Sequence, residues 1–240
     1  MSAWRFERKY LLSAAARDHL LARWQGHLVR APFTDARARY PVLSQYYDSP
    51  DLAFYREKLA GDGLRRKVRV RTYGHRFGEG GPWFLEIKHR TQETVHKTRL
   101  RLPGARRAHL DPDSWRGLDP AAAGPFVALL ETHNLRPTAQ VWYVREAYEA
   151  AAEPGLRVTF DSSVRALHAR ARMSRAALYD DAGALLPADR MVLEVKGPEE
   201  LPAWVRDGIG PLELQQQSVP KYVMAVEALH LVTFLTGVFA

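Results

Sequence analysis

The sequence predicts an α+β fold in which a many-stranded, mainly antiparallel β-sheet closes into a barrel and helices pack outside it. Long stretches alternate apolar and charged side chains with period two, which is typical of strands. Segments with helical spacing and helix-capping residues separate them. Short polar connections at 74–82 and 91–95 suit hairpins rather than crossovers. No repeat or low-complexity linker is visible, so we expect one domain over residues 1–240.

Helix signals mark a few segments. Ser13 is the expected N-cap of a helix over 14–25, whose apolar stripe includes Leu20 and Trp24. Further helices are expected at 125–134, from about 202, and from about 219 to 229. Residues 106–123 are expected to form a long, loosely structured insertion.

Strands are expected between these helices. The alternating segments are 4–12, 45–48, 64–73, 83–90, 97–102, 141–150, 156–161 and 191–197, with one or two more strands within 164–178.

Composition excludes several classes of protein. The 240 residues are 46% hydrophobic and 26% charged, which is typical of a soluble globular protein. The absence of cysteine excludes a disulfide framework, a thiolate metal site and a cysteine nucleophile. A net charge of +8 indicates an anionic partner. No signal peptide is visible, and the terminal apolar run is too short to span a bilayer, so a cytoplasmic protein without a membrane segment is expected.

Charged residues share single faces of the predicted strands. Successive strand side chains point to opposite faces, so Lys67, Arg69 and Arg71 lie together, opposite Val68 and Val70. The same alternation gathers charged or polar residues on the other strands: Glu7 and Lys9; Glu86, Lys88 and Arg90; Lys97, Arg99 and Arg101; Tyr143 and Arg145; Arg157, Thr159 and Asp161; Glu194 and Lys196.

Two interpretations of these faces remain open at this point. Any one strand fits the solvated face of an ordinary antiparallel sheet. As a set, however, the faces are dominated by cations, whose mutual repulsion a bound polyanion would offset. Arginine binds phosphate oxygens through a rigid fork, and lysine adds a point charge. The carboxylates of Glu7, Glu86, Glu194 and Asp161 can pair with these cations or ligate Mg²⁺ or Mn²⁺. In a closed sheet the charged faces would line a tunnel.

Short motifs occur in a fixed order along the chain. They are Arg5-Phe6-Glu7-Arg8-Lys9-Tyr10, Tyr47-Asp48-Ser49-Pro50-Asp51, Lys67-Val68-Arg69-Val70-Arg71, Leu85-Glu86-Ile87-Lys88, Leu193-Glu194-Val195-Lys196 and Lys221-Tyr222. Together they resemble the VTC (vacuolar transporter chaperone) catalytic domain over residues 5–230. This domain is the polyphosphate polymerase branch of the CYTH, or triphosphate tunnel metalloenzyme, superfamily.

The resemblance implies a basic antiparallel β tunnel that binds a nucleoside triphosphate such as ATP, polyphosphate and a divalent metal, often manganese. It implies Glu194 as the metal ligand and Tyr143 beside the phosphates. The strand faces described above leave Glu86 and Glu7 as further metal candidates. The implied phosphate-binding positions are Lys9, Arg69, Arg71, Lys88, Lys97, Arg145 and Lys221, of which Arg69, Arg71, Lys88, Arg145 and Lys221 are the catalytic candidates. Strand alternation adds Lys67, Arg99 and Lys196 to the phosphate-binding set.

Two positions depart from the superfamily's patterns. Arg5 stands where the hydrolase branch carries the first glutamate of Glu-x-Glu-x-Lys, which favours the polymerase branch. Pro220 stands where the family usually has a serine before the lysine, so Ser218 is the candidate to supply the missing hydroxyl.

The implied activity is transfer of the terminal phosphoryl group of a nucleoside triphosphate to a growing polyphosphate chain. Such a transfer depends on alignment and charge neutralisation rather than on covalent catalysis. The alternatives are a hydrolase of triphosphate or polyphosphate and a polyphosphate- or nucleotide-binding module without turnover. A nucleic-acid partner is not expected, because the cations lack the interleaved aromatic residues of base-stacking platforms.

Overall fold

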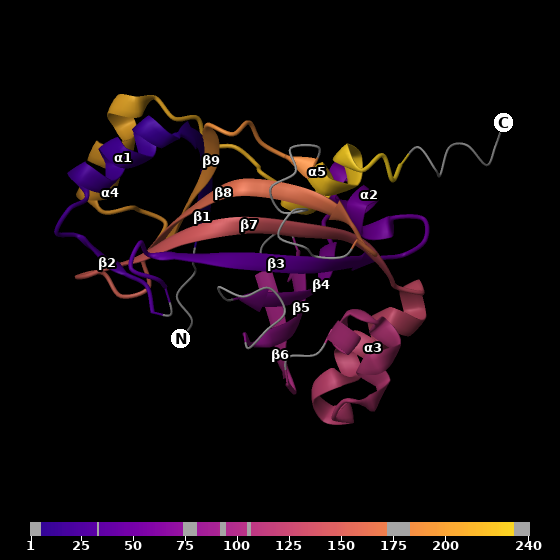
Figure 1. Ribbon diagram of the computed structural model, residues 1–240. Coiled ribbons are helices and arrows are strands. Elements are labelled where there is room, and N and C mark those ends of the chain that lie inside the picture. Colours follow the sequence, from indigo (N-terminus) through magenta and orange to yellow (C-terminus); the bar gives the residue numbers. More distant parts are fainter. Residues whose placement is uncertain are drawn as a thin grey trace. The chain divides into compact units, whose positions relative to one another are not determined.

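Antiparallel pairing organises the part of the chain that the structure describes. The computed structural model describes residues 6–32, 34–73, 81–91, 95–104, 107–171 and 183–232. These residues form nine strands of one sheet in the order β1-β9-β8-β7-β3-β4-β5-β6, with β2 paired to β7 off this path (Figure 1). The strands are β1 Phe6–Ser13, β2 Leu28–Arg30, β3 Arg39–Asp48, β4 Arg65–Tyr73, β5 Trp83–Arg90, β6 Val95–Leu102, β7 Arg136–Ala150, β8 Arg157–His168 and β9 Arg190–Gly197.

Five α-helices and three short 3₁₀ helices accompany the strands in the described ranges. They are α1 Ala14–Arg23, α2 Ala53–Ala60, α3 Pro120–His133, α4 Ala203–Ile209 and α5 Lys221–Ala228, with η1 Arg107–Leu110, η2 Pro112–Gly117 and η5 Gly210–Leu212. The chain divides into two units, each built from three segments. The first unit is Met1–Pro41, Tyr143–Val164 and Leu186–Pro220, and the second is Val42–Trp142, Arg165–Leu185 and Lys221–Ala240.

In the first unit, α1 and α4 lie side by side (Figure 1). Trp24 joins them, because its indole Nε1 donates to the main-chain oxygen of Trp204 at 3.0 Å. A Cβ atom at Gly208 would lie 2.3 Å from that indole nitrogen, so only glycine permits this approach. Ser13 caps α1 as predicted, since its hydroxyl accepts from Ala16 N at 3.2 Å.

In the second unit, the apolar faces of β4 and β5 form the core beneath η2 and α3. Val68, Val70 and Leu85 are each at most 1% exposed and pack with Trp115 and Phe126. These are the even-numbered positions of β4 and the odd-numbered positions of β5, as the alternation predicted. The opposite positions of both strands therefore carry the charged side chains.

Several elements differ from the sequence-based expectation. The strands expected at 45–48 and 141–150 begin earlier, at Arg39 and Arg136, and β2 was not expected. The prediction of a loosely structured insertion at 106–123 is wrong, because η1, η2 and the first turn of α3 occupy most of this segment. Position 5 and much of the 164–178 segment lie outside the described residues.

Helix α2 was also missed, because the side chain that caps it lies several residues before its start rather than at the N-cap position. It follows Leu52, a left-handed residue with φ 58° and no side-chain cap. Asp48 replaces the cap, since its carboxylate accepts from Phe54 N at 2.9 Å and from Tyr55 N at 3.0 Å.

The expected closure of the sheet into a barrel is not borne out by the described pairing. In a closed barrel every strand has a neighbour on each side. The described strands instead follow an open path that ends at β1 and β6, each of which pairs with one other strand. Lys97, Arg99 and Arg101 stand exposed on β6, and charges of this kind discourage pairing at a sheet edge.

Among the helices of the described ranges, none combines the length and the apolar character that a membrane crossing requires.

Candidate functional site

Strands β4, β5 and β6 bring six cations onto one face around a single glutamate. The pairing aligns Arg69 with Glu86 and Glu86 with Arg99. The adjacent row aligns Lys67 with Lys88 and Lys88 with Lys97, so three lysines stand side by side across three strands. We call this set the cation cluster: Lys67, Arg69, Arg71, Lys88, Lys97 and Arg99 around Glu86. Directly opposed like charges destabilise a sheet, which makes the cluster suited to a multiply charged anion.

Glu86 is the centre of the cation cluster. It is 1% exposed, and its carboxylate lies 2.7 Å from Arg69 Nη2, 2.8 Å from Lys97 Nζ and 3.2 Å from Arg99 Nε. Burial alone would raise the pKa of Glu86, but Arg69, Arg71 and Lys97 lower it to about 2. Glu86 is therefore ionised at neutral pH and fixes the directions of three cations.

Two residues of β3 complete the cation cluster. The Arg71 guanidinium donates to the Ser44 hydroxyl at 2.9 Å, and Arg69 Nη1 donates to the Tyr46 hydroxyl at 3.4 Å. Tyr46 is 5% exposed. Burial would raise the pKa of Tyr46, but Arg69, Arg71 and Lys67 lower it to about 7. Sequence analysis missed both residues, although their alternation with Gln45 and Tyr47 could have placed them on this face.

Tyr46 is expected to titrate near pH 7. The near-ultraviolet absorption of phenolate should rise through that range and should lack this step in Tyr46→Phe. Because the folded pKa lies below the ordinary value of 10, the Tyr46 contribution to stability is full above pH 10 and is lost as the pH falls through about 7. Tripolyphosphate should move the step to higher pH by occupying the neighbouring cations. An unchanged step would show that the anion binds elsewhere.

The buried carboxylate of Asp48 connects the start of α5 to β3. Tyr222, the next residue after Lys221, donates its hydroxyl to Asp48 Oδ2 at 2.6 Å and stacks on Tyr46 with ring centroids 4.9 Å apart. Asp48 is fully buried. The start of α5 is thus fixed beside the tyrosine that contacts Arg69, and Lys221 is the first residue of this helix. Sequence analysis quoted Asp48 and Tyr222 as motif residues but gave neither this role.

The first unit holds a second charged group, in which cations and carboxylates are balanced. Arg145 binds Asp161 through two bonds, Nε to Oδ1 at 2.6 Å and Nη2 to Oδ2 at 2.7 Å. Its Nη2 also lies 3.1 Å from Glu194 Oε2, while Lys196 Nζ lies 2.7 Å from Glu194 Oε1. We call this set the carboxylate cluster: Glu7, Asp161 and Glu194 with Lys9, Arg145 and Lys196.

Two lysines contact Glu7, the carboxylate that β1 contributes to the carboxylate cluster. Glu7 contacts Lys9 at 2.7 Å and Lys196 at 3.4 Å. Burial would lower the pKa of Lys9, but Glu194 and Glu7 raise it above its ordinary value. Burial opposes the charge of Arg145 as well, yet Asp161 keeps its pKa well above the ordinary value. Lys9 and Arg145 are therefore charged at neutral pH. With Lys196, the cluster holds as many cationic side chains as carboxylates.

The carboxylate cluster has the donor chemistry for a hard divalent cation. Mg²⁺ and Mn²⁺ prefer carboxylate and hydroxyl oxygens. Thr159 pairs with Glu194 in register, and its buried hydroxyl has no hydrogen-bond partner. No three His, Asp or Glu side chains converge into a ready metal cage anywhere in the described ranges. Glu194, with the Thr159 hydroxyl beside it, is the residue of this cluster that would hold a divalent cation, and Lys196 is the cation that contacts its Oε1 here.

The structure sorts the predicted site residues into these two groups. Of the remaining candidates, Tyr143 is buried in the first unit with its ring 5.3 Å from the Arg145 guanidinium carbon. Ser218 is exposed in the segment before α5. Glu86, a candidate metal ligand, instead holds cations in the second unit.

The fold and site define an antiparallel α+β protein that carries one cationic and one charge-balanced strand face. A model of the VTC domain matches residues 4–230, and the chain belongs to this family. Membership confirms the resemblance seen in the motifs. It associates the chain with polyphosphate, nucleotides and divalent metals. No curated protein matches the chain.

The solved structures that match the chain include the two below, of which the first resembles it in fold. One is a "putative adenylate cyclase" from Bacillus halodurans, with 12% identity and a TM-score of 0.52 over 90% of this chain and 94% of that chain. The other is the PH1819 protein from Pyrococcus horikoshii OT3, with 14% identity and a TM-score of 0.45 over 98% of this chain and 99% of that chain.

Proposed function

We propose that this chain is a polyphosphate polymerase-like phosphotransferase that moves the terminal phosphoryl group of a nucleoside triphosphate such as ATP onto a growing polyphosphate. The cation cluster carries the proposal, because six cations around one carboxylate form a face that a linear polyphosphate would neutralise. Membership of the VTC domain family gives it independent support.

The chain's own residues would act by holding and aligning phosphates. Arg69 and Arg71 present guanidinium groups whose directions are set by Glu86 and Ser44, so they are preorganised for phosphate oxygens. Further positive charge along the bound polyphosphate would come from the lysine row of Lys67, Lys88 and Lys97 and from Lys221. The terminal phosphate of polyphosphate is largely ionised at neutral pH, so its attack needs no general base.

Glu194 is the residue that would hold a divalent metal, with the Thr159 hydroxyl beside it and Glu7 contacting the same Lys196. When bound, Mg²⁺ or Mn²⁺ neutralises charge on phosphate oxygens. With the metal on Glu194, the Lys196 ammonium would be available to a phosphate oxygen.

Incubation with ATP and Mn²⁺ tests the activity. Long polyphosphate resolved on a gel is expected, whereas release of free phosphate alone would make the chain a hydrolase. Neither product, with tripolyphosphate still bound, would make it a binding module. Arg71→Gln should remove the product. The control variant Arg37→Gln removes an equal charge at an exposed position of the first unit and should still form polyphosphate.

Tripolyphosphate is expected to raise the melting temperature more than sulfate does at equal ionic strength. The cation cluster repels itself when empty, and a ligand at a hundred times its Kd stabilises by about 2.7 kcal/mol. Differential scanning calorimetry measures the two shifts. Equal shifts would identify the cation cluster as an ordinary solvated face.

Glu194→Gln is expected to abolish Mn²⁺-dependent consumption of ATP while tripolyphosphate binding persists. The amide keeps the size of the side chain but loses the charge that attracts a divalent cation. Calorimetric titration with tripolyphosphate and with Mn²⁺ separates the two effects. Retained metal dependence would move the metal away from Glu194.

A further inference from the structure

Two aromatic rings lie at one end of the charged face that β4, β5 and β6 form. Tyr73 is the last residue of β4, and Phe84 of β5 stands in the row between Arg71 and Arg101. The rings of Tyr73 and Phe84 meet edge to face, with centroids 5.9 Å apart. Both side chains are partly exposed. We call these two residues the aromatic pair. At the opposite end of the same face, β4 and β5 carry Arg65, Lys67, Lys88 and Arg90.

Arg99 is held against the aromatic pair. Its guanidinium carbon lies 3.5 Å from the centre of the Phe84 ring and 5.8 Å from the centre of the Tyr73 ring. Its Nε lies 3.2 Å from the Glu86 carboxylate, which fixes the group from a further direction. The Arg99 side chain is nevertheless 40% exposed. Because Phe84 covers one side of the planar guanidinium, its other side is the one open to a ligand.

An arginine fixed on an aromatic ring can act as a platform for a nucleobase. Guanidinium groups and aromatic rings both stack on the faces of bases. Successive rows of the charged face are two residues, or about 7 Å, apart along the strands. From Phe84 they lead through the row of Arg69 and Glu86 to the row of Lys67 and Lys88. Phosphates attached to a base over Arg99 would therefore extend along the cation cluster toward its lysines.

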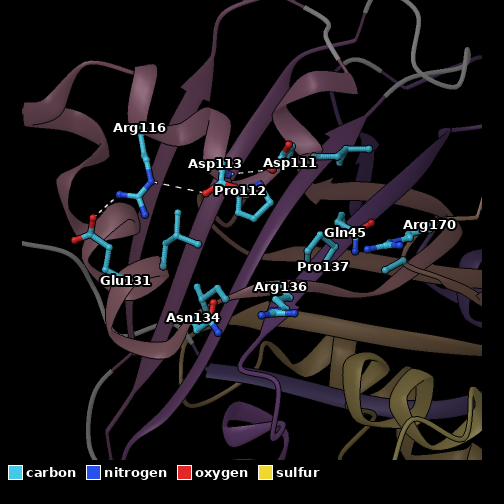
Figure 2. A pocket seen from close by; sticks show the side chains of 14 residues that line it. Gln45, Asp111, Pro112, Asp113, Arg116, Glu131, Asn134, Arg136, Pro137 and Arg170 are labelled. Carbon is cyan, nitrogen blue, oxygen red and sulfur yellow. Dashed lines mark hydrogen bonds and ion pairs between the residues drawn. The ribbon is translucent and has the colours of Figure 1, made fainter. Parts of the chain in front are cut away.

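The largest pocket described in the second unit fits this ligand less well. It has a volume of about 900 Å³, and Gln45 of β3 lines it. Gln45 lies between two residues of β3 that contact the cation cluster, so it points to the opposite face of the strand. Three carboxylates also line the pocket, those of Asp111, Asp113 and Glu131, and Figure 2 shows the last two holding Arg116. Carboxylates repel phosphate, which favours the cationic face.

We propose that Arg99 and the aromatic pair bind the base of the nucleoside triphosphate, with its terminal phosphate toward the lysine row of Lys67, Lys88 and Lys97. This inference rests on the proposed function, since it assigns one part of that function's substrate. It also gives the substrate a direction, because the base and the transferable phosphate lie at opposite ends of the cation cluster. Stacking does not depend on the hydrogen-bonding edges of a base, so the site would accept any of them.

Calorimetric titration of the full chain with ATP and with methyl triphosphate, both without divalent metal, tests the base site. Both ligands are monoesters of triphosphate, but only ATP carries a base. ATP is expected to bind about tenfold more tightly, which is within the contribution of one stacked base. Phe84→Leu removes the ring beneath Arg99, so the ratio of the two affinities should fall to about one in this variant.

Arg99→Lys is a second variant, which keeps the charge but loses the planar group, so the ratio should fall here as well. Arg90→Lys makes the same change at the exposed opposite end of β5 and should leave the ratio as in the wild type. The base site is overturned by a ratio near one in the wild type, by an unchanged ratio in either folded variant, or by a ratio that falls in Arg90→Lys. Each of these results would leave the phosphotransferase standing. If neither ligand binds, the cation cluster is refuted and the base site with it.

Discussion

Val70→Asp is expected to unfold the second unit, whereas Arg69→Gln, one residue away, leaves it folded. Val70 is 1% exposed beneath Trp115 and Phe126, so the substitution would place a carboxylate in an apolar core. Burial of an unpaired charge costs several kcal/mol, which is comparable to the total stability of about 5–15 kcal/mol. Urea unfolding followed by circular dichroism measures the loss.

Arg69→Gln is the matched variant on the other face of the same strand. Glu86 retains Lys97 and Arg99 as charge partners, so the fold should persist while tripolyphosphate affinity falls. The reverse result would be an unfolded Arg69→Gln and a stable Val70→Asp. It would show that the buried and charged faces of β4 are assigned the wrong way round, and it would refute the cation cluster as a binding surface.

Arg145→Met is the second substitution with a large expected effect. It keeps the length of the side chain but removes the charge that binds Asp161, which is fully buried, and Glu194. Breaking a buried ion pair by removing one partner typically costs about 3–5 kcal/mol, because the other charge stays buried. Chemical denaturation of the variant and the wild type gives the difference directly.

The double variant Arg145→Met with Asp161→Leu is the control for this loss. Replacing both partners of a buried pair by apolar residues is often close to neutral, so the second substitution should restore much of the stability. If the double variant is as unstable as the sum of the two single variants, the loss comes from packing rather than from an orphaned carboxylate.

Alternation along strands was sufficient to predict the two faces of β4 and β5. Val68 and Arg69 point in opposite directions whatever the register of the sheet, because the period of a strand is two. Helix α1 was also predictable, since Ser13 caps it locally. Helix α2 was not, because its start is stabilised by the Asp48 carboxylate, which accepts from the N–H groups of Phe54 and Tyr55 six and seven residues later in the chain.

The division of the site into a cationic and a balanced cluster could not be read from the sequence. Glu86 and Glu194 stand in the same Glu-x-Lys pattern, but their neighbours across the strands differ. Register places Glu86 between Arg69 and Arg99, and places Glu194 opposite Lys9 and Thr159. Pairing between distant segments decides which charges meet, and local patterns carry no information about it.

The exposed cations of β6 serve two requirements that evolution could separate. A charge of either sign at the edge of a sheet discourages another strand from adding to it. Only a positive charge attracts phosphate. Acidic residues in place of Lys97 and Arg99 would still discourage pairing at the edge, but they would repel both phosphate and the buried Glu86 carboxylate that these cations contact. A descendant of this chain that lost its anion could therefore carry glutamates at these positions only if Glu86 were replaced as well.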